Sequence, residues 1–146
     1  MKTGCPPIRF MAFLLSLTSA AWSQEPGTRH AEAPGAVLAR VPEKARLRSN
    51  PLEGDPEAVA AGKKLFEMHC AECHGKGADG TRRGPSLRVD ELQHATPGEI
   101  FWILTNGVVR RGMPAWSKLP EPQRWQIITY LRRFGDPARA GNLGPR

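Results

Sequence analysis

A five-residue segment, residues 70–74, constrains this chain more than any other part of it. It reads Cys-Ala-Glu-Cys-His, and Cys-x-x-Cys-His is the pattern at which a c-type haem is attached. On a helical turn Cys70 and Cys73 occupy neighbouring positions, so each thiol can form a thioether with one of the two vinyl groups of a haem. His74 follows directly and supplies an imidazole nitrogen as the proximal iron ligand. The segment therefore predicts one haem c, bound covalently through two thioethers.

Two other uses of this cysteine pair fit the sequence less well. A structural zinc site needs about four ligands, whereas the chain has 3 cysteines in total and, besides His74, only the scattered His30, His69 and His94. We expect His69 and His94 to be surface or hydrogen-bonded histidines. A thioredoxin-like redox pair belongs in a strand–helix–strand context, and no alternating apolar segment precedes the cysteines.

Residues 1–23 have the features of a secretory signal. Lys2 and Arg9 are followed by a short apolar run and by small residues that allow cleavage after Ala21 or Ser23. The run is too short to span a bilayer comfortably, so retention as an uncleaved anchor is the alternative. The signal predicts export to the periplasm, where bacterial c-type haems are assembled.

The remainder of the chain divides into three expected segments. Residues 24–50 show no helical or strand periodicity and contain prolines, glycines and scattered basic side chains, which predicts a flexible leader. Such a basic leader, or an uncleaved signal, would be the part that contacts a membrane, although a solvated linker is the simpler interpretation. We expect the folded domain over residues 51–135 and a disordered tail over residues 136–146.

Three main helices are expected within residues 51–135, which gives an all-α fold around the haem. Each has recognisable end signals: an N-cap followed by proline, a capping box, or a terminal glycine. So small a core needs a metal or cross-link to hold it together, and a buried haem would serve. The helices are expected to run from Asp55 and Pro56 through the cysteine segment to Gly75, from Thr96 to Gly107, and from about Pro122 to Gly135.

The second axial ligand decides between electron transfer and bond chemistry at the iron. Two of the 4 methionines lie in the predicted signal, and Met68 precedes Cys70 on the same helix, where it cannot reach the far face of the ring. Met113 remains, in a loop between a glycine and a proline. Simple packing is the alternative role for this residue. A His74 and Met113 pair would fill both axial positions and favour one-electron transfer.

Over residues 51–135 the chain resembles the class I monohaem cytochromes c. The resemblance rests on motifs in a fixed order: Ala-Gly-Lys-Lys-Leu-Phe at 61–66, the haem segment with its glycine at 70–75, Gly-Pro-Ser-Leu at 84–87, Gly-Met-Pro at 112–114 and Tyr-Leu at 130–131. It implies a cytochrome c-like fold, and it implies that the carbonyl of Pro85 accepts a hydrogen bond from His74. Residues 96–116 are also similar to the small cytochromes that accompany periplasmic dehydrogenases.

Two further residues are candidates for contact with the haem. Arg82 is a candidate partner for a propionate, and Trp102 for a ring N–H donor to a propionate or a wall at the ring edge. The same reasoning applies to Arg83 and Trp116. Surface exposure of the arginines and plain core packing of the tryptophans are the alternatives.

These features predict a periplasmic electron-transfer protein, not an enzyme, that acts as a monomer. Its partners would be a redox protein donor and acceptor, such as a dehydrogenase, an oxidase or a reductase. The alternatives are a haem subunit of a larger dehydrogenase or oxidase complex, and a haem enzyme or sensor with an open iron position. The net charge of +7 does not indicate nucleic acid binding, because export and haem attachment give such binding no role.

Overall fold

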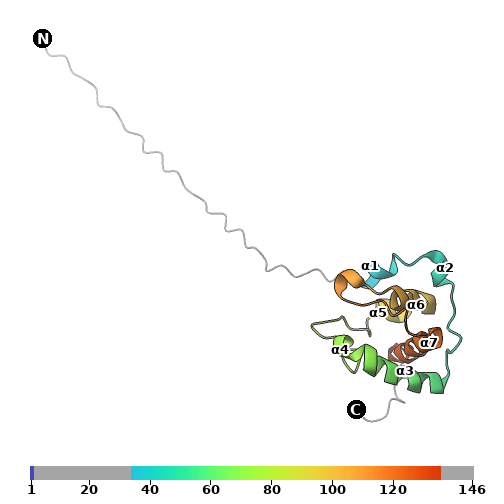
Figure 1. The fold of residues 1–146 in the computed structure, drawn as a ribbon. Coiled ribbons are helices and arrows are strands. Elements are labelled where there is room, and N and C mark those ends of the chain that lie inside the picture. Colours follow the sequence, from blue (N-terminus) through green and yellow to red (C-terminus); the bar gives the residue numbers. More distant parts are fainter. Residues whose placement is uncertain (2–33, 136–146) are drawn as a thin grey trace. The chain divides into compact units, whose positions relative to one another are not determined.

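The computed structural model describes Met1 and residues 34–135 of the 146-residue chain. Within residues 34–135 all regular structure is helical, apart from an isolated antiparallel bridge between Val108 and Met113. The prediction of an all-α fold is confirmed. The α-helices, labelled in Figure 1, are α1 (Pro34–Leu38), α2 (Glu43–Arg46), α3 (Pro56–His69), α4 (Ala71–His74), α5 (Asp90–His94), α6 (Pro97–Asn106) and α7 (Glu121–Leu131). Two 3-10 helices, η1 (Val109–Arg111) and η2 (Arg132–Phe134), follow α6 and α7.

Several predicted segments lie outside the described residues. These are the signal peptide beyond Met1, residues 24–33 of the leader, and the tail over residues 136–146. In the part of the chain that the structure does describe, no helix combines the length and the apolar character that crossing a membrane requires.

Helix α3 begins at the predicted cap and packs along α7. The Asp55 carboxylate accepts hydrogen bonds from the backbone N–H groups of Glu57 (2.8 Å) and Ala58 (3.3 Å), which satisfies two of the donors that a helix start leaves free. Figure 1 shows α3 beside α7. The two backbones approach so closely that a methyl group added at Gly62 would overlap the backbone carbonyl of Gln126. Glycine at this position therefore sets the distance between the two helices.

Helix α6 begins with the predicted capping box. The Thr96 hydroxyl accepts a hydrogen bond from the Glu99 backbone N–H (3.2 Å), and the Glu99 carboxylate accepts one from the Thr96 backbone N–H (2.6 Å). The buried face of the helix includes Phe101, whose ring stacks on Trp125 of α7 with 4.1 Å between centroids. The helix ends at Gly107, at φ 68°, a conformation that suits glycine. The three helices that the sequence predicts are thus the ones that form the core.

The prediction of a flexible leader does not hold for residues 34–50. This segment forms α1 and α2 and lies against α6, and its Val41 and Asn50 are buried. Arg46 donates to the carbonyls of Val41 (3.1 Å) and Leu38 (2.8 Å) and forms an ion pair with Glu99. The folded unit therefore begins before residue 51. Sequence periodicity missed it because the segment is held by arginine side chains rather than by an apolar stripe.

A second difference lies between Gly75 and Thr96, where one expected helix ends and the next begins. The residues between them include the short helix α5, whose five residues are too few for a periodic pattern. Its carboxyl end is held by Arg132, which donates to the backbone carbonyls of Gln93 and Ala95. The segment is thus fixed to the end of α7 as well as to the haem-attachment sequence that precedes it.

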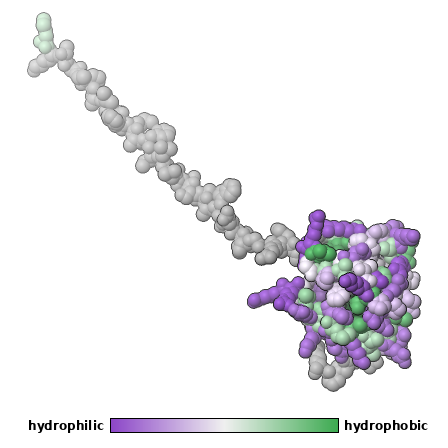
Figure 2. Space-filling model, in the orientation of Figure 1, coloured by the Kyte–Doolittle hydropathy of each residue, from purple (hydrophilic) through white to green (hydrophobic). Residues whose placement is uncertain are grey.

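The surface of the folded unit is mainly hydrophilic on the face that Figure 2 shows, with apolar residues in small groups between polar ones. Within residues 34–135, the large apolar side chains with the greatest exposure are Leu47, Met68 and Val109. Isolated apolar side chains of this kind are normal on a protein surface.

Candidate functional site

The two cysteines and His74 lie on one tight turn at the end of α3. Helix α3 stops at His69 because the backbone of Cys70, at φ −120°, leaves the helical range. The Cys70 carbonyl then accepts hydrogen bonds from the N–H groups of Cys73 (3.1 Å) and His74 (2.9 Å), which closes α4 as a single turn. Both thiols are free and half-buried. The turn thus presents two thiols and an imidazole together.

The thiol of Cys70 is a poor redox nucleophile in this setting. Burial, together with the charge of a Cys73 thiolate, raises the pKa of Cys70 to about 12. Reactive cysteines in Cys-x-x-Cys redox motifs instead have a lowered pKa, because the thiolate is the nucleophile. The electrostatic setting of Cys70 is therefore unlike that of the nucleophilic cysteine in such motifs.

The ring of His74 is oriented by the backbone of the following loop. Its Nδ1 lies 2.8 Å from the carbonyl oxygen of Pro85. A carbonyl can only accept, so Nδ1 carries the proton and Nε2 is left with its lone pair available for a metal. This is the contact that the resemblance implies. Gly84 lets the loop come this close, because a Cβ there would lie 2.9 Å from the Cys73 carbonyl oxygen and 3.2 Å from His74 Cε1.

The loop after α4 is held to the turn by short-range hydrogen bonds. The Thr81 hydroxyl donates to the Cys73 carbonyl (2.5 Å), and the Gly80 N–H donates to the His74 carbonyl (2.8 Å). Gly80 has φ 89°, and a Cβ there would lie 2.5 Å from the backbone nitrogen of Ser86. The loop consequently folds back on itself and presents the Pro85 carbonyl to His74.

Met113 lies in a second loop, which follows α6. Its backbone exchanges hydrogen bonds with Val108, at 3.0 Å and 3.3 Å, in an isolated antiparallel bridge. Gly112 precedes it in the left-handed region at φ 85°, and Pro114 follows so close to Gly107 that a Cβ on that glycine would lie 2.6 Å from the Pro114 carbonyl carbon. The Met113 side chain is half-buried against the hydrophobic core. The backbone around this thioether is thus fixed on both sides.

Trp116 connects the Met113 loop to the cysteine turn. Its backbone N–H donates to the Leu104 carbonyl of α6 (3.0 Å). Its ring contacts the ring of His69, the last residue of α3, with 5.1 Å between centroids and 54° between planes. His69 was expected to be a surface or hydrogen-bonded histidine, because nothing in the sequence indicates a partner 47 positions away.

Arg82 and Trp102 have no polar contact with the cysteine turn in the described part of the chain. Arg82 is exposed and makes no hydrogen bond or ion pair among residues 34–135, whereas its neighbour Arg83 pairs with Glu72. Trp102 is half-buried, and its carbonyl accepts a hydrogen bond from the Asn106 side chain (2.8 Å). Their assignment to a haem propionate stays a prediction.

The residues around the turn fit a haem better than a bare metal ion. Among the residues that the structure describes, no group of three or more His, Cys, Asp or Glu side chains is placed to hold a metal ion. The turn instead offers two thiols and the Nε2 of His74, and the Met113 loop, whose Trp116 contacts His69, offers a thioether. Apolar side chains of both loops and of the turn pack against one hydrophobic core; they include Cys70, Ala71, Leu87, Met113 and Trp116. Thiols for attachment, two axial donors and an apolar surround are what a haem c requires.

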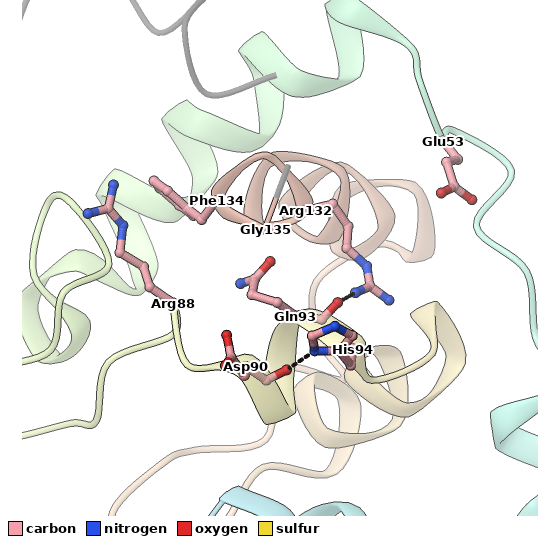
Figure 3. A pocket seen from close by; sticks show the side chains of 8 residues that line it. All are labelled: Glu53, Arg88, Asp90, Gln93, His94, Arg132, Phe134 and Gly135. Atoms are coloured by element: carbon pink, nitrogen blue, oxygen red, sulfur yellow. Dashed lines mark hydrogen bonds between the residues drawn. The ribbon is translucent and has the colours of Figure 1, made fainter. Parts of the chain in front are cut away.

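A cavity of about 390 Å³ lies elsewhere, between α5 and the end of α7 (Figure 3). Some of its polar groups are engaged within the protein: Arg132 with the carbonyls of Gln93 and Ala95, and His94 Nδ1 with the Asp90 carbonyl at 2.8 Å. The side-chain oxygen of Gln93, in contrast, is buried and has no hydrogen-bond partner among the described residues. No predicted site residue lines it. The lining residues are Glu53, Arg88, Asp90, Gln93, His94, Arg132, Phe134 and Gly135.

Residues 57–131 match the family model described as cytochrome C oxidase, cbb3-type, subunit III. The matched segment covers just over half of the chain. It begins in α3 and ends with α7, and so contains the cysteine turn and both loops.

Curated relatives include subunits of larger complexes. The cbb3-type cytochrome c oxidase subunit CcoP of Rubrivivax gelatinosus is 33% identical over 101 residues, which cover 66% of this chain and 33% of the relative. Subunit FixP of Sinorhizobium medicae is 36% identical over 78 residues, 47% of this chain and 27% of the relative. Quinohemoprotein alcohol dehydrogenase ADH IIB of Pseudomonas putida is 31% identical over 91 residues, 62% of this chain and 13% of the relative. The chain therefore spans a third or less of the length of these relatives.

Among solved structures, cytochrome CL of Methylophaga aminisulfidivorans is similar to this chain. The two superpose with a TM-score of 0.52 and 26% identity, over 65% of this chain and 70% of the other. The cytochrome c-like form of the all-α fold is thereby confirmed.

Proposed function

This chain belongs to the family of cbb3-type cytochrome c oxidase subunit III, and we propose that it transfers single electrons through one haem c held at the cysteine turn. The observation that carries the proposal is the arrangement of Cys70, Cys73 and His74 on one turn, with His74 Nδ1 bonded to the Pro85 carbonyl at 2.8 Å. The thiols would attach the haem, and the orientation of the ring would direct Nε2 to the iron.

Met113 would supply the second axial donor. Its thioether comes from a loop whose backbone is pinned by the bridge to Val108 and by the approach of Gly107 to Pro114. With both axial positions taken by the protein, no position is open for oxygen or peroxide. The proposal therefore assigns no enzymatic activity to the chain.

Haem c, when bound, supplies an iron that changes its charge by one electron. The protein's part is to hold the two donor atoms still during that change. Backbone hydrogen bonds fix the loops on both sides: Thr81 and Gly80 to the cysteine turn, and Met113 to Val108. A site held by such bonds needs little rearrangement when its charge changes, which suits electron transfer.

A role as a subunit of a larger complex is the second candidate. It is supported by the relatives, two of which are named as oxidase subunits and are at least three times as long as the matched segment. In either role the partners would be a redox protein donor and acceptor. From the predicted signal we infer a periplasmic protein, either free as a monomer or attached to the membrane.

Haem attachment can be tested by expressing the full chain in a bacterium that exports and matures c-type cytochromes. After denaturation, the mass of the chain should be increased by one haem, and the haem should resist extraction by acidified solvent. Replacement of both Cys70 and Cys73 by alanine should abolish the increase. A parent chain that carries no haem, or releases it on extraction, would contradict the proposal. Size-exclusion chromatography of native membrane extracts then separates the two roles. A free carrier should elute at the mass of a monomer, whereas a subunit should elute together with an oxidase or dehydrogenase.

A further inference from the structure

The contact between His69 and Trp116 joins the two segments that carry the proposed haem-binding residues. His69 ends α3 and directly precedes Cys70, and Trp116 lies three residues after Met113. Their ring centroids are 5.1 Å apart, and the planes are inclined by 54°, within the range in which aromatic rings attract each other. The pair is therefore a side-chain link between the attachment turn and the methionine loop.

Each of the two residues is anchored in its own segment, so the contact between their rings can fix the position of one segment relative to the other. His69 belongs to the last turn of α3, whose neighbouring Leu65 and Phe66 are buried in the core. Trp116 is tied to α6 by its N–H bond to the Leu104 carbonyl at 3.0 Å, and its own carbonyl accepts from Leu119 at 3.0 Å. Both rings are half-buried. The backbones of both residues are therefore fixed, and the ring contact is where the two segments meet.

The backbone hydrogen bonds of Met113 do not reach the attachment turn. Its backbone partner is Val108, which belongs to the same loop. The bridge fixes the shape of this loop, but it does not fix how far the loop lies from the cysteines. Trp116 contacts Leu104 on one side and His69 on the other, and these contacts limit the distance between the loop and the cysteines.

We propose that His69 and Trp116 are a pair of positioning residues that keep the Met113 loop closed over the site. This inference rests on the proposed function and adds two residues to it. Neither residue forms a hydrogen bond with a thiol of the turn, with the His74 ring or with the Met113 thioether. Loss of either ring would leave the haem attached and His74 oriented, and it would raise the fraction of molecules in which the thioether has left the iron.

The rate of carbon monoxide binding to the reduced protein measures that fraction, because carbon monoxide can bind the iron only after the thioether has dissociated. His69→Ala and Trp116→Ala should each bind carbon monoxide about fivefold faster than the parent, the factor that corresponds to a ring contact of ordinary strength. The double variant should be little faster than either single variant, because both remove the same contact. His69→Phe should restore the parent rate, since a ring remains.

His94→Ala is the matched control. His94 is also a histidine at the end of a helix, but its Nδ1 bonds to the Asp90 carbonyl on α5. It should leave the rate unchanged. Thermal unfolding of every variant, followed by circular dichroism, establishes that the single variants remain folded.

The outcomes separate this inference from the proposed function. If the parent itself binds carbon monoxide as fast as Met113→Ala, the methionine is not a ligand and both proposals fail. If the parent is slow and Met113→Ala is fast, the proposed function holds. In that case unchanged rates in His69→Ala and Trp116→Ala, or effects that add fully in the double variant, overturn the positioning role alone.

Discussion

Arg46 and Glu99 form an ion pair that fastens the N-terminal segment to the first turn of α6. The Glu99 side chain is 8% exposed and that of Arg46 30% exposed, so the pair is largely shielded from water. The same carboxylate accepts the Thr96 N–H at 2.6 Å and completes the capping box. One acidic side chain therefore serves both the start of α6 and the attachment of the segment before it.

Replacement of Arg46 by alanine should destabilise the protein by about 2–3 kcal/mol, because it leaves a buried carboxylate without its cation. Chemical denaturation of the haem-loaded protein measures this change. Glu43→Ala is the control: its carboxylate also faces Arg46, at 3.8 Å, but is 81% exposed, and exposed pairs contribute about 0–1 kcal/mol. Equal effects of the two substitutions would contradict this account of the segment.

Shortening the chain tests the same boundary without a substitution. A chain that begins at residue 34 keeps both α1 and α2 and is the reference. A chain that begins at residue 51 should lose at least as much stability as Arg46→Ala, since it also removes buried Val41 and Asn50 and the Arg48 guanidinium that lies 4.2 Å from the Phe101 ring centroid. Equal thermal midpoints for the two shortened chains would show that residues 34–50 do not stabilise the fold.

Gly62→Ala should destabilise the core, since the added methyl group overlaps the Gln126 carbonyl where α3 crosses α7. Overpacking of this kind costs about 1–3 kcal/mol, and thermal unfolding should show it. Gly35→Ala provides the comparison, because nothing lies within 4 Å of its added methyl group. It should be neutral or slightly stabilising within α1. A neutral Gly62→Ala would mean that the two helices are farther apart than described.

Acid should weaken the protein in part through Glu121. The indole N–H of Trp125, followed by Arg48, lowers the pKa of this carboxyl group in the folded state. A lowered folded pKa means that the stabilisation is present above the unfolded pKa and is lost as the pH falls through the folded value. Between about pH 5 and pH 3 the midpoint of thermal unfolding should therefore fall less in Glu121→Gln than in the parent. Parallel pH profiles would contradict the assignment.

The sequence predicts the parts of this fold that depend on local signals. The Asp55 cap, the capping box of Thr96 and Glu99, and the cysteine turn all appear where the pattern places them, because each is made by residues two to four positions apart. Residues 34–50 were misassigned for the opposite reason. Their stability comes from Arg46 and from contacts with residues about 50 positions away, and such contacts leave no periodic pattern.

The candidate site also contains parts that the sequence predicts and parts that it does not. Its donors are visible in the sequence, since Cys-x-x-Cys-His is a local motif and Met113 is the one methionine suitably placed along the chain. The contact of His69 with Trp116 is not visible, because it depends on how α3 and the loop after α6 are brought together in the folded unit. The assignment of Arg82 and Trp102 to a haem propionate stays a prediction, because it concerns a contact with the haem and not with another residue of the chain.

The central claim is that His74 and Met113 together fill both axial positions of one covalently attached haem. The most direct test compares the parent with Met113→Ala in carbon monoxide binding to the reduced protein and in the weak long-wavelength thioether-to-iron band of the oxidised protein. The account predicts that the parent shows the band and binds carbon monoxide slowly, whereas Met113→Ala keeps its haem, lacks the band, binds carbon monoxide rapidly and has a lower reduction potential. A parent without the band, or a variant that behaves as the parent does, would contradict it.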